Sequence, residues 1–264
     1  MRDRRLTAPG ISKPLLNAFL CYIAWFLRRN FHAVRVSRFG RAPDVSGLPA
    51  IFCLNHPGWW DPLIALTLAY RLYPERLHYG PIEAAALGRY KFFERLGFFG
   101  IEPGTSAGAV RFLRVGESIL NMSNTGLWVT AQGTFVDPRV RPTEIRGGIG
   151  HLLRRLPEVA VVPVAIEFPF WEERRPEALA RFGEPLIIRD GKSLTAKQWT
   201  CRIARSLQSA QDALAEETLS RNTKAFEILL GGKEGMGGLY DVWRTLRARM
   251  RGERFRRAHG PERL

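Results

Sequence analysis

Short segments rich in β-branched and aromatic residues alternate with longer helical segments along most of this chain, and this alternation constrains its fold more than any other feature. The expected strands are bounded by Gly, Pro or Asn and lie near residues 33–37, 50–54, 77–80, 98–101, 127–131, 160–166 and 185–188. Helices are expected near residues 14–30, 62–73, 83–96, 107–122, 147–156, 196–217, 222–230 and 239–250. This pattern predicts an α/β fold in a single domain, with a mixed, mostly parallel sheet covered by helices on both faces. A length of 264 residues suffices for one such domain.

A histidine and an aspartate stand five positions apart in residues 55–62, whose sequence is Asn-His-Pro-Gly-Trp-Trp-Asp-Pro. A hydrogen bond between His56 and Asp61 would fix the imidazole tautomer. It would also stabilise the imidazolium that forms when His56 removes a proton from a hydroxyl. Because no nearby Ser or Cys is an obvious nucleophile, the pair indicates that the hydroxyl belongs to a substrate, as in direct acyl transfer.

Asp61 also fits a purely structural role. It precedes Pro62 at the start of an expected helix, where an aspartate is a favoured N-cap and proline a favoured first helical residue. The two roles are compatible, and the spacing alone does not decide between them.

Three further segments follow in a recognisable order. Residues 91–103 read Lys-Phe-Phe-Glu-Arg-Leu-Gly-Phe-Phe-Gly-Ile-Glu-Pro, residues 127–135 read Leu-Trp-Val-Thr-Ala-Gln-Gly-Thr-Phe, and residues 161–165 read Val-Val-Pro-Val-Ala. With residues 55–62 they resemble the four motifs of the glycerolipid and lysophospholipid acyltransferase superfamily. Those motifs run Asn-His-x4-Asp, Gly-x-Ile-Phe-Ile-Asp-Arg, Glu-Gly-Thr-Arg and Val-Pro-Val. The resemblance covers about residues 33–190 and is that of a divergent, bacterial-type member.

The chain departs from these motifs at the positions that hold the acceptor. The arginine that ends the second motif is Pro103 here, the arginine that ends the third is Phe135, and the glutamate of the third is Gln132. The superfamily uses those arginines to bind an acceptor phosphate, which Pro and Phe cannot do. Arg139 and Arg141 lie close downstream as candidate replacements, and the sequence does not show whether either reaches the site.

The resemblance implies a membrane-peripheral O-acyltransferase at the cytoplasmic face of the cell membrane. His56 would act as general base, and Asp61 would orient it. The acyl donor would be acyl-CoA or acyl carrier protein, and the acceptor a lipid hydroxyl without a phosphate monoester, as in a glycolipid, a glycosylated isoprenoid or a lysophospholipid. By resemblance, three residues would line the acceptor subsite: Gln132, Gly133 and Thr134. Two aromatic residues of the first motif would wall the acyl groove or touch the bilayer, with core packing as the alternative: Trp59 and Trp60.

Charge and composition agree with these partners. The chain has 40 Lys and Arg against 25 Asp and Glu, a net charge of +15. A basic surface suits nucleic acid, anionic lipid or an acidic acyl donor. No helix-turn-helix, zinc-finger or RNP pattern is visible, so we predict no nucleic-acid partner. The sequence also lacks a metal-ligand cluster, and we predict neither a metal nor a cofactor.

The first 32 residues are predicted to associate with a membrane. The apolar run at residues 14–27 is shorter than the roughly 20 residues that span a bilayer, and Arg28 and Arg29 stand where a signal peptide would be cleaved. We therefore expect an interfacial helix on anionic lipid, with a helix packed on the protein's own core as the alternative. Three aromatic side chains would lie at the headgroup level: Tyr22, Trp25 and Phe26.

Residues 33–230 are predicted to form the acyltransferase domain, and residues 231–264 a Gly-rich break followed by a basic helix or tail. The tail would be either solvated or in contact with an anionic membrane. Two other functions stay open: a catalytically silent lipid-binding protein of the same fold, and a lysophosphatidic acid acyltransferase.

Overall fold

The computed structural model describes residues 6–232. Its α-helices are α1 (Lys13–Asn30), α2 (Asp61–Leu72), α3 (Ala84–Arg89), α4 (Ser106–Leu120), α5 (Gly148–Leu153) and α6 (Ala196–Ser220). Its strands are β1 (Ala33–Ser37), β2 (Ala50–Leu54), β3 (Leu77–Glu83), β4 (Phe98–Ile101), β5 (Thr125–Thr130), β6 (Val159–Glu167), β7 (Glu177–Phe182), β8 (Leu186–Ile188) and β9 (Phe226–Gly231). Short 3-10 helices cover Lys91–Leu96 (η2), Gly191–Ser193 (η3) and Thr223–Ala225 (η4).

The strands form one nine-stranded sheet in the order β4-β3-β5-β2-β6-β7-β1-β9, with β8 paired to β6. Within the run β4-β3-β5-β2-β6 each strand is parallel to the next, and β1 is parallel to β7. The pairs β6–β7, β6–β8 and β1–β9 are antiparallel. The predicted mixed, mostly parallel sheet is therefore confirmed.

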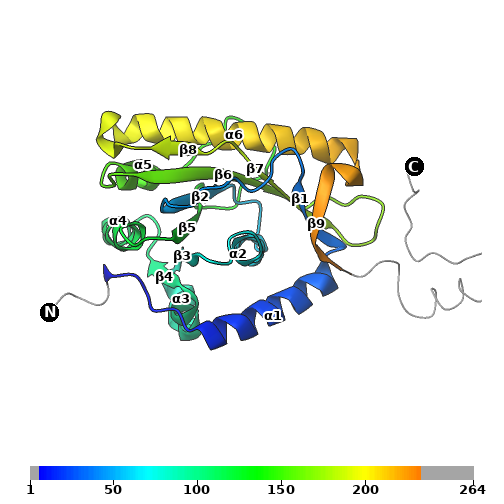
Figure 1. Cartoon of the computed structure of the whole chain (residues 1–264), viewed down its shortest axis with the longest axis horizontal. Coiled ribbons are helices and arrows are strands. Elements are labelled where there is room, and N and C mark those ends of the chain that lie inside the picture. The colour runs from blue at the N-terminus through cyan, green and yellow to red at the C-terminus, as the bar shows by residue number, and fades with distance from the viewer. Residues whose placement is uncertain (1–5, 233–264) are drawn as a thin grey trace, which may run out of the picture.

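Helices cover both faces of the sheet, as Figure 1 shows with α5 and α6 on one side and α2 and α1 on the other. Alternate residues of β2 point into the two cores, because successive side chains of a strand face opposite ways. Phe52 and Leu54 join the core under α1 and α2, whereas Ile51 and Cys53 join the core under α4, α5 and α6. The two-sided α/β architecture in a single domain is confirmed.

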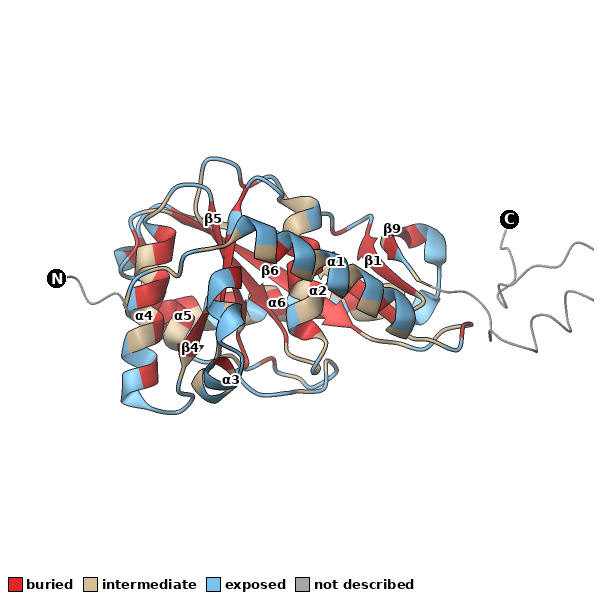
Figure 2. Cartoon of the chain, turned by 90° about the horizontal axis from the view of Figure 1, so that it is seen from below, coloured by how far each residue is buried: buried red, intermediate tan, exposed pale blue. Residues whose placement is uncertain are grey.

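Helix α1 packs with one face and exposes the other. Ile23 and Leu27 are buried in the core beside α2, while Tyr22 and Trp25 are 50% and 52% exposed. Figure 2 shows α1 crossing the outside of this face, with exposed and half-buried residues toward the viewer. Packing on the protein's own core, the alternative expected for this segment, thus holds for one face of the helix, and the other face is exposed. Within residues 6–232, no helix is long and apolar enough to cross a membrane.

The helix predicted at residues 222–230 is wrong. Residues 226–231 form β9, which pairs antiparallel with the edge of β1, and only the short η4 precedes it. Strand β7 was not expected, because its sequence, Glu-Ala-Leu-Ala-Arg-Phe, lacks β-branched residues. Strand β7 pairs with β6 on one side and with β1 on the other, and these pairings override its weak local preference for a strand. The helix predicted at residues 239–250 lies outside the described residues, as does most of the predicted tail.

Candidate active site

The turn between β2 and α2 brings His56 and Asp61 together. His56 Nδ1 lies 2.5 Å from Asp61 Oδ2, and the backbone N–H of Gly58 donates to the same oxygen at 3.1 Å. The Asp61 side chain is fully buried, whereas that of His56 is 17% exposed. The N-cap of α2 is Trp60, so the interpretation of Asp61 as the N-cap is wrong. Asp61 is the first helical residue, and its carboxylate points back toward the histidine.

The hydrogen bond with Asp61 determines which nitrogen of His56 is free. Because Nδ1 donates to the carboxylate, the neutral ring keeps its proton there, and Nε2 is left as the proton acceptor. Nε2 makes no hydrogen bond to any of the described residues. Burial raises the pKa of the Asp61 carboxyl, and the hydrogen bonds from His56 and Gly58 partly oppose that rise. The carboxylate thus depends on the histidine for its stabilisation.

The backbone of His56 is held from the loop after β5. Gln132 Oε1 accepts a hydrogen bond from the backbone N–H of His56 at 2.8 Å, and the N–H of Val136 donates to the His56 carbonyl at 2.9 Å. Neighbouring Asn55 is fully buried and binds Ile166 of β6 through both ends of its side-chain amide, at 2.8 and 3.0 Å. These contacts fix the position of His56, and sequence reasoning missed this role of Asn55 and Gln132.

A cavity of about 930 Å³ opens beside His56 and Asp61. Its wall is mostly apolar and includes side chains from α2, β3, β4, η2, α4 and β5, such as Leu66, Tyr79, Phe93, Phe98, Phe112 and Val129. A largely apolar pocket of this size with a few polar groups at one place is typical of a small-molecule or lipid site. The arrangement can place an apolar chain in the cavity and a polar group at His56.

Of the residues predicted to contact substrate, Trp59 and Gly133 line this cavity, whereas Gln132, Thr134 and Trp60 do not. Trp60 instead packs against Phe31, with ring centroids 4.9 Å apart. The wall also includes Phe135, which stands in place of the third motif's arginine, and Arg146, which was not predicted to line it. The Phe135 ring lies edge-on to the His56 ring, with centroids 4.6 Å apart and planes at 61°.

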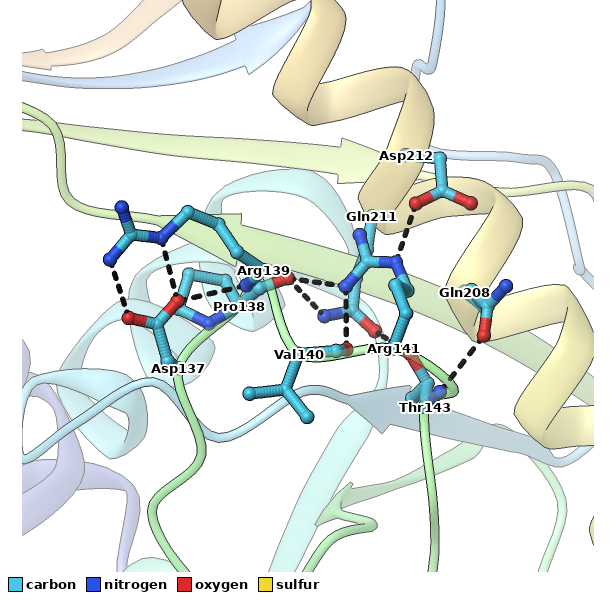
Figure 3. Close-up of polar contacts among 9 residues, drawn as sticks. All are labelled: Asp137, Pro138, Arg139, Val140, Arg141, Thr143, Gln208, Gln211 and Asp212. Carbon is cyan, nitrogen blue, oxygen red and sulfur yellow. Dashed lines mark hydrogen bonds and ion pairs between the residues drawn. The ribbon is translucent and has the colours of Figure 1, made fainter.

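Arg139 and Arg141, the candidate replacements for the missing motif arginines, are engaged elsewhere (Figure 3). Arg139 forms an ion pair with Asp137 at 2.6 Å, and Arg141 forms one with Asp212 of α6, also at 2.6 Å. Arg141 additionally donates to the carbonyl of Pro138 at 2.6 Å. Neither arginine lines the cavity, so neither replaces those arginines there.

The cavity wall offers no thiol or serine nucleophile among the described residues. Cys53 of β2 is fully buried in the core under α4, α5 and α6, and it does not line the cavity. Burial raises the pKa of its thiol to about 12, so the reactive thiolate does not form near neutral pH. The geometry therefore suits a base that activates a substrate hydroxyl.

Comparison of the chain with protein-family models and with curated protein sequences finds no match. Among solved structures, the chain is similar to the crystal structure of the 1-acyl-sn-glycerophosphate (LPA) acyltransferase PlsC from Thermotoga maritima. The TM-score is 0.47 at 14% sequence identity, and the match covers 81% of this chain and 84% of that chain. At this identity the likeness says nothing about substrate or reaction.

Proposed function

We propose that this protein is a membrane-peripheral O-acyltransferase that moves a fatty acyl group from a thioester to a lipid hydroxyl. The observation that carries the proposal is the hydrogen-bonded pair of His56 and buried Asp61 at the wall of a large apolar cavity. A base with a free Nε2 beside an apolar cavity suits an acyl chain whose carboxyl end must meet a hydroxyl. The motif order around residues 55–165 points to the same chemistry.

In this proposal, Nε2 of His56 accepts the proton of the acceptor hydroxyl as the oxygen attacks the thioester carbonyl. A C–O bond forms and a tetrahedral intermediate develops. When it collapses, the C–S bond breaks and the imidazolium returns the proton to the departing thiol of CoA or acyl carrier protein. Asp61 keeps the ring in the productive tautomer and stabilises its charged form. No covalent acyl-enzyme is needed, and the reaction requires neither metal nor cofactor.

The proposed acceptor lacks a phosphate monoester. Pro103 and Phe135 both line the cavity. By the motif resemblance, they stand where the superfamily has arginines that bind an acceptor phosphate. An unpaired charge in a partly dry site costs several kcal/mol. A glycolipid, a glycosylated isoprenoid or a lysophospholipid with a headgroup fits this wall better than lysophosphatidic acid.

The proposed membrane surface is an aromatic band that joins α1 to the cavity. Phe26 of α1 contacts Trp59, with ring centroids 6.4 Å apart, and Tyr22 stacks on Phe26 at 5.8 Å. Phe19 and Trp59 also line the cavity. Aromatic residues and the flanking Arg28 and Arg29 suit an anionic bilayer surface, so a lipid could pass from the membrane into the cavity at the cytoplasmic face.

Thiol release from acyl-CoA, measured with and without a membrane lipid extract, tests this function, and mass spectrometry identifies the acylated product. We expect release that depends on the extract and a lipid heavier by one acyl chain. A protein that binds lipid but releases no thiol from acyl-CoA or from acyl carrier protein would instead be the silent lipid-binding protein.

A further inference from the structure

Arg146 lies in the loop between β5 and α5, beside the segment that holds His56. Its backbone N–H donates to the carbonyl of Ala131 at 2.8 Å, and the N–H of Ala131 donates to the carbonyl of Leu54 at 2.9 Å. Leu54 is the last residue of β2, two positions before His56. The position of Arg146 is therefore tied by backbone hydrogen bonds to the strand end that carries the base.

The side chain of Arg146 lies across Gly133. A Cβ atom placed on Gly133 would stand 2.3 Å from Nε and 2.6 Å from Cδ of Arg146, far inside contact distance. Gly133 also has a φ of +68°, a conformation that favours glycine. The close approach lays the arginine side chain along the cavity wall, which both residues line together with His56.

Arg146 has no carboxylate partner among the described residues. Nearby Arg139 and Arg141 each form an ion pair, and Arg146 forms none within 4.0 Å with any of residues 6–232. Among the described residues that line the cavity, it is the only Lys or Arg. Two carboxylates of the same wall, Glu83 and Glu102, form no ion pair with it. Arg146 is thus a cation of this cavity whose guanidinium pairs with no carboxylate of the part of the chain that the structure describes.

We propose that Arg146 binds a singly charged phosphate of one of the two substrates, either the phosphodiester or pyrophosphate of the acyl donor or the phosphodiester of a lysophospholipid acceptor. The inference rests on the proposed function, because the phosphate is that of an acyl-transfer substrate. A planar guanidinium matches two phosphate oxygens with two N–H groups. A phosphate monoester approaches two negative charges at neutral pH, whereas each phosphorus of a diester or pyrophosphate link carries one. The single positive charge of Arg146 therefore balances one phosphate group of a diester or pyrophosphate link.

The test compares Arg146→Gln with wild type on two substrate pairs, each with one member that carries phosphate and one that lacks it. The donors are acyl-CoA and the phosphate-free S-acyl pantetheine, and the acceptors are lysophosphatidylcholine and monoacylglycerol. We expect kcat/KM to fall about 10- to 100-fold for the phosphate-bearing member of one pair and by less than about twofold for its phosphate-free counterpart. The pair that separates identifies the source of the phosphate.

Two control variants accompany the test. Arg146→Lys keeps the charge without the fork and should recover part of the loss. Arg139→Gln removes an exposed arginine outside the cavity and should leave all four rates unchanged. Equal losses on both members of each pair, or no loss on any substrate, would overturn the assignment.

A binding measurement separates this inference from the proposed function. If no substrate pair gives acyl transfer, the proposed function fails, and calorimetric titration with CoA, pantetheine and lysophosphatidylcholine still tests Arg146. Wild type should then bind CoA or lysophosphatidylcholine about 10-fold or more tightly than Arg146→Gln, with pantetheine unaffected. Equal affinities of the two proteins for all three probes would contradict the assignment.

Discussion

The side-chain oxygen of Gln132 accepts the backbone N–H of His56 at 2.8 Å, across 76 positions of sequence. The N–H of Val136 completes the contact by donating to the His56 carbonyl. The general base of the proposed reaction is therefore positioned by the loop after β5, as well as by Asp61.

Replacing Gln132 with methionine should lower kcat while leaving KM nearly unchanged, because the residue holds His56 and does not line the cavity. The lost hydrogen bond should also lower the free energy of unfolding by about 1–3 kcal/mol. Gln132→Glu keeps an acceptor oxygen and should retain most of the activity. Steady-state kinetics and urea denaturation of both variants check this. A larger loss in Gln132→Glu than in Gln132→Met would contradict a positioning role.

His78 should make the protein less stable in mild acid. Its Nδ1 accepts the indole N–H of Trp128 at 3.0 Å and its Nε2 donates to the Tyr73 carbonyl at 2.9 Å, so the neutral ring is fully bonded. Burial lowers its pKa to about 4. Between the ordinary value near 6.5 and this value, the unfolded chain binds more protons, so stability falls as the pH drops through that window.

Urea denaturation at pH 7 and pH 4.5 measures this effect in wild type and in His78→Gln, which keeps one acceptor and one donor. Wild type should lose about 2–3 kcal/mol more than the variant on going to pH 4.5. The raised pKa of Asp61 acts in the opposite direction and is common to both proteins. Identical pH dependence in the two proteins would show that His78 is not the group responsible.

Local patterns predicted the strand-turn-helix unit around His56, because the apolar run of β2 and the segment Asp61-Pro62 are contiguous in sequence. Contacts formed at long range were less predictable. Residues 226–231 became β9 through pairing with β1, nearly 200 positions away. Long-range contacts also explain two errors at the site. Gln132 was predicted to contact substrate but binds the backbone of His56, and Arg146 was not predicted to line the cavity. The cavity wall exists only where separate loops converge in the folded chain.

The exposed aromatics of α1 should drive membrane binding. Substituting both Tyr22 and Trp25 with serine should reduce sedimentation with anionic vesicles about tenfold or more, since each buried aromatic ring contributes about 1–2 kcal/mol. Folding should be little affected, because both side chains are about half exposed. The matched control is Leu219→Ser on α6, on the opposite side of the sheet (Figure 1). Equal binding by the double variant and the control would place the membrane contact elsewhere.

Phe135→Arg should shift acceptor preference toward lysophosphatidic acid by about tenfold relative to lysophosphatidylcholine, because it puts a cation beside His56. The useful quantity is the ratio of kcat/KM values for the two acceptors, since loss of the Phe135 ring also loosens the imidazole. Phe135→Leu keeps the wall apolar and should leave that ratio unchanged. A wild-type enzyme that already favours lysophosphatidic acid would refute the proposed acceptor class.

The most direct test of the account is the rate of thiol release by His56→Ala, with acyl-CoA and the lipid extract as substrates. Loss of the general base should lower kcat/KM by about 100-fold or more, while the variant stays folded and unfolds in a cooperative thermal transition. Asp61→Asn should also be strongly impaired. It removes the negative charge that stabilises the imidazolium, and with it the carboxylate that accepts a hydrogen bond from Nδ1 of His56. Near wild-type turnover by folded His56→Ala would contradict the central claim that His56 is the base.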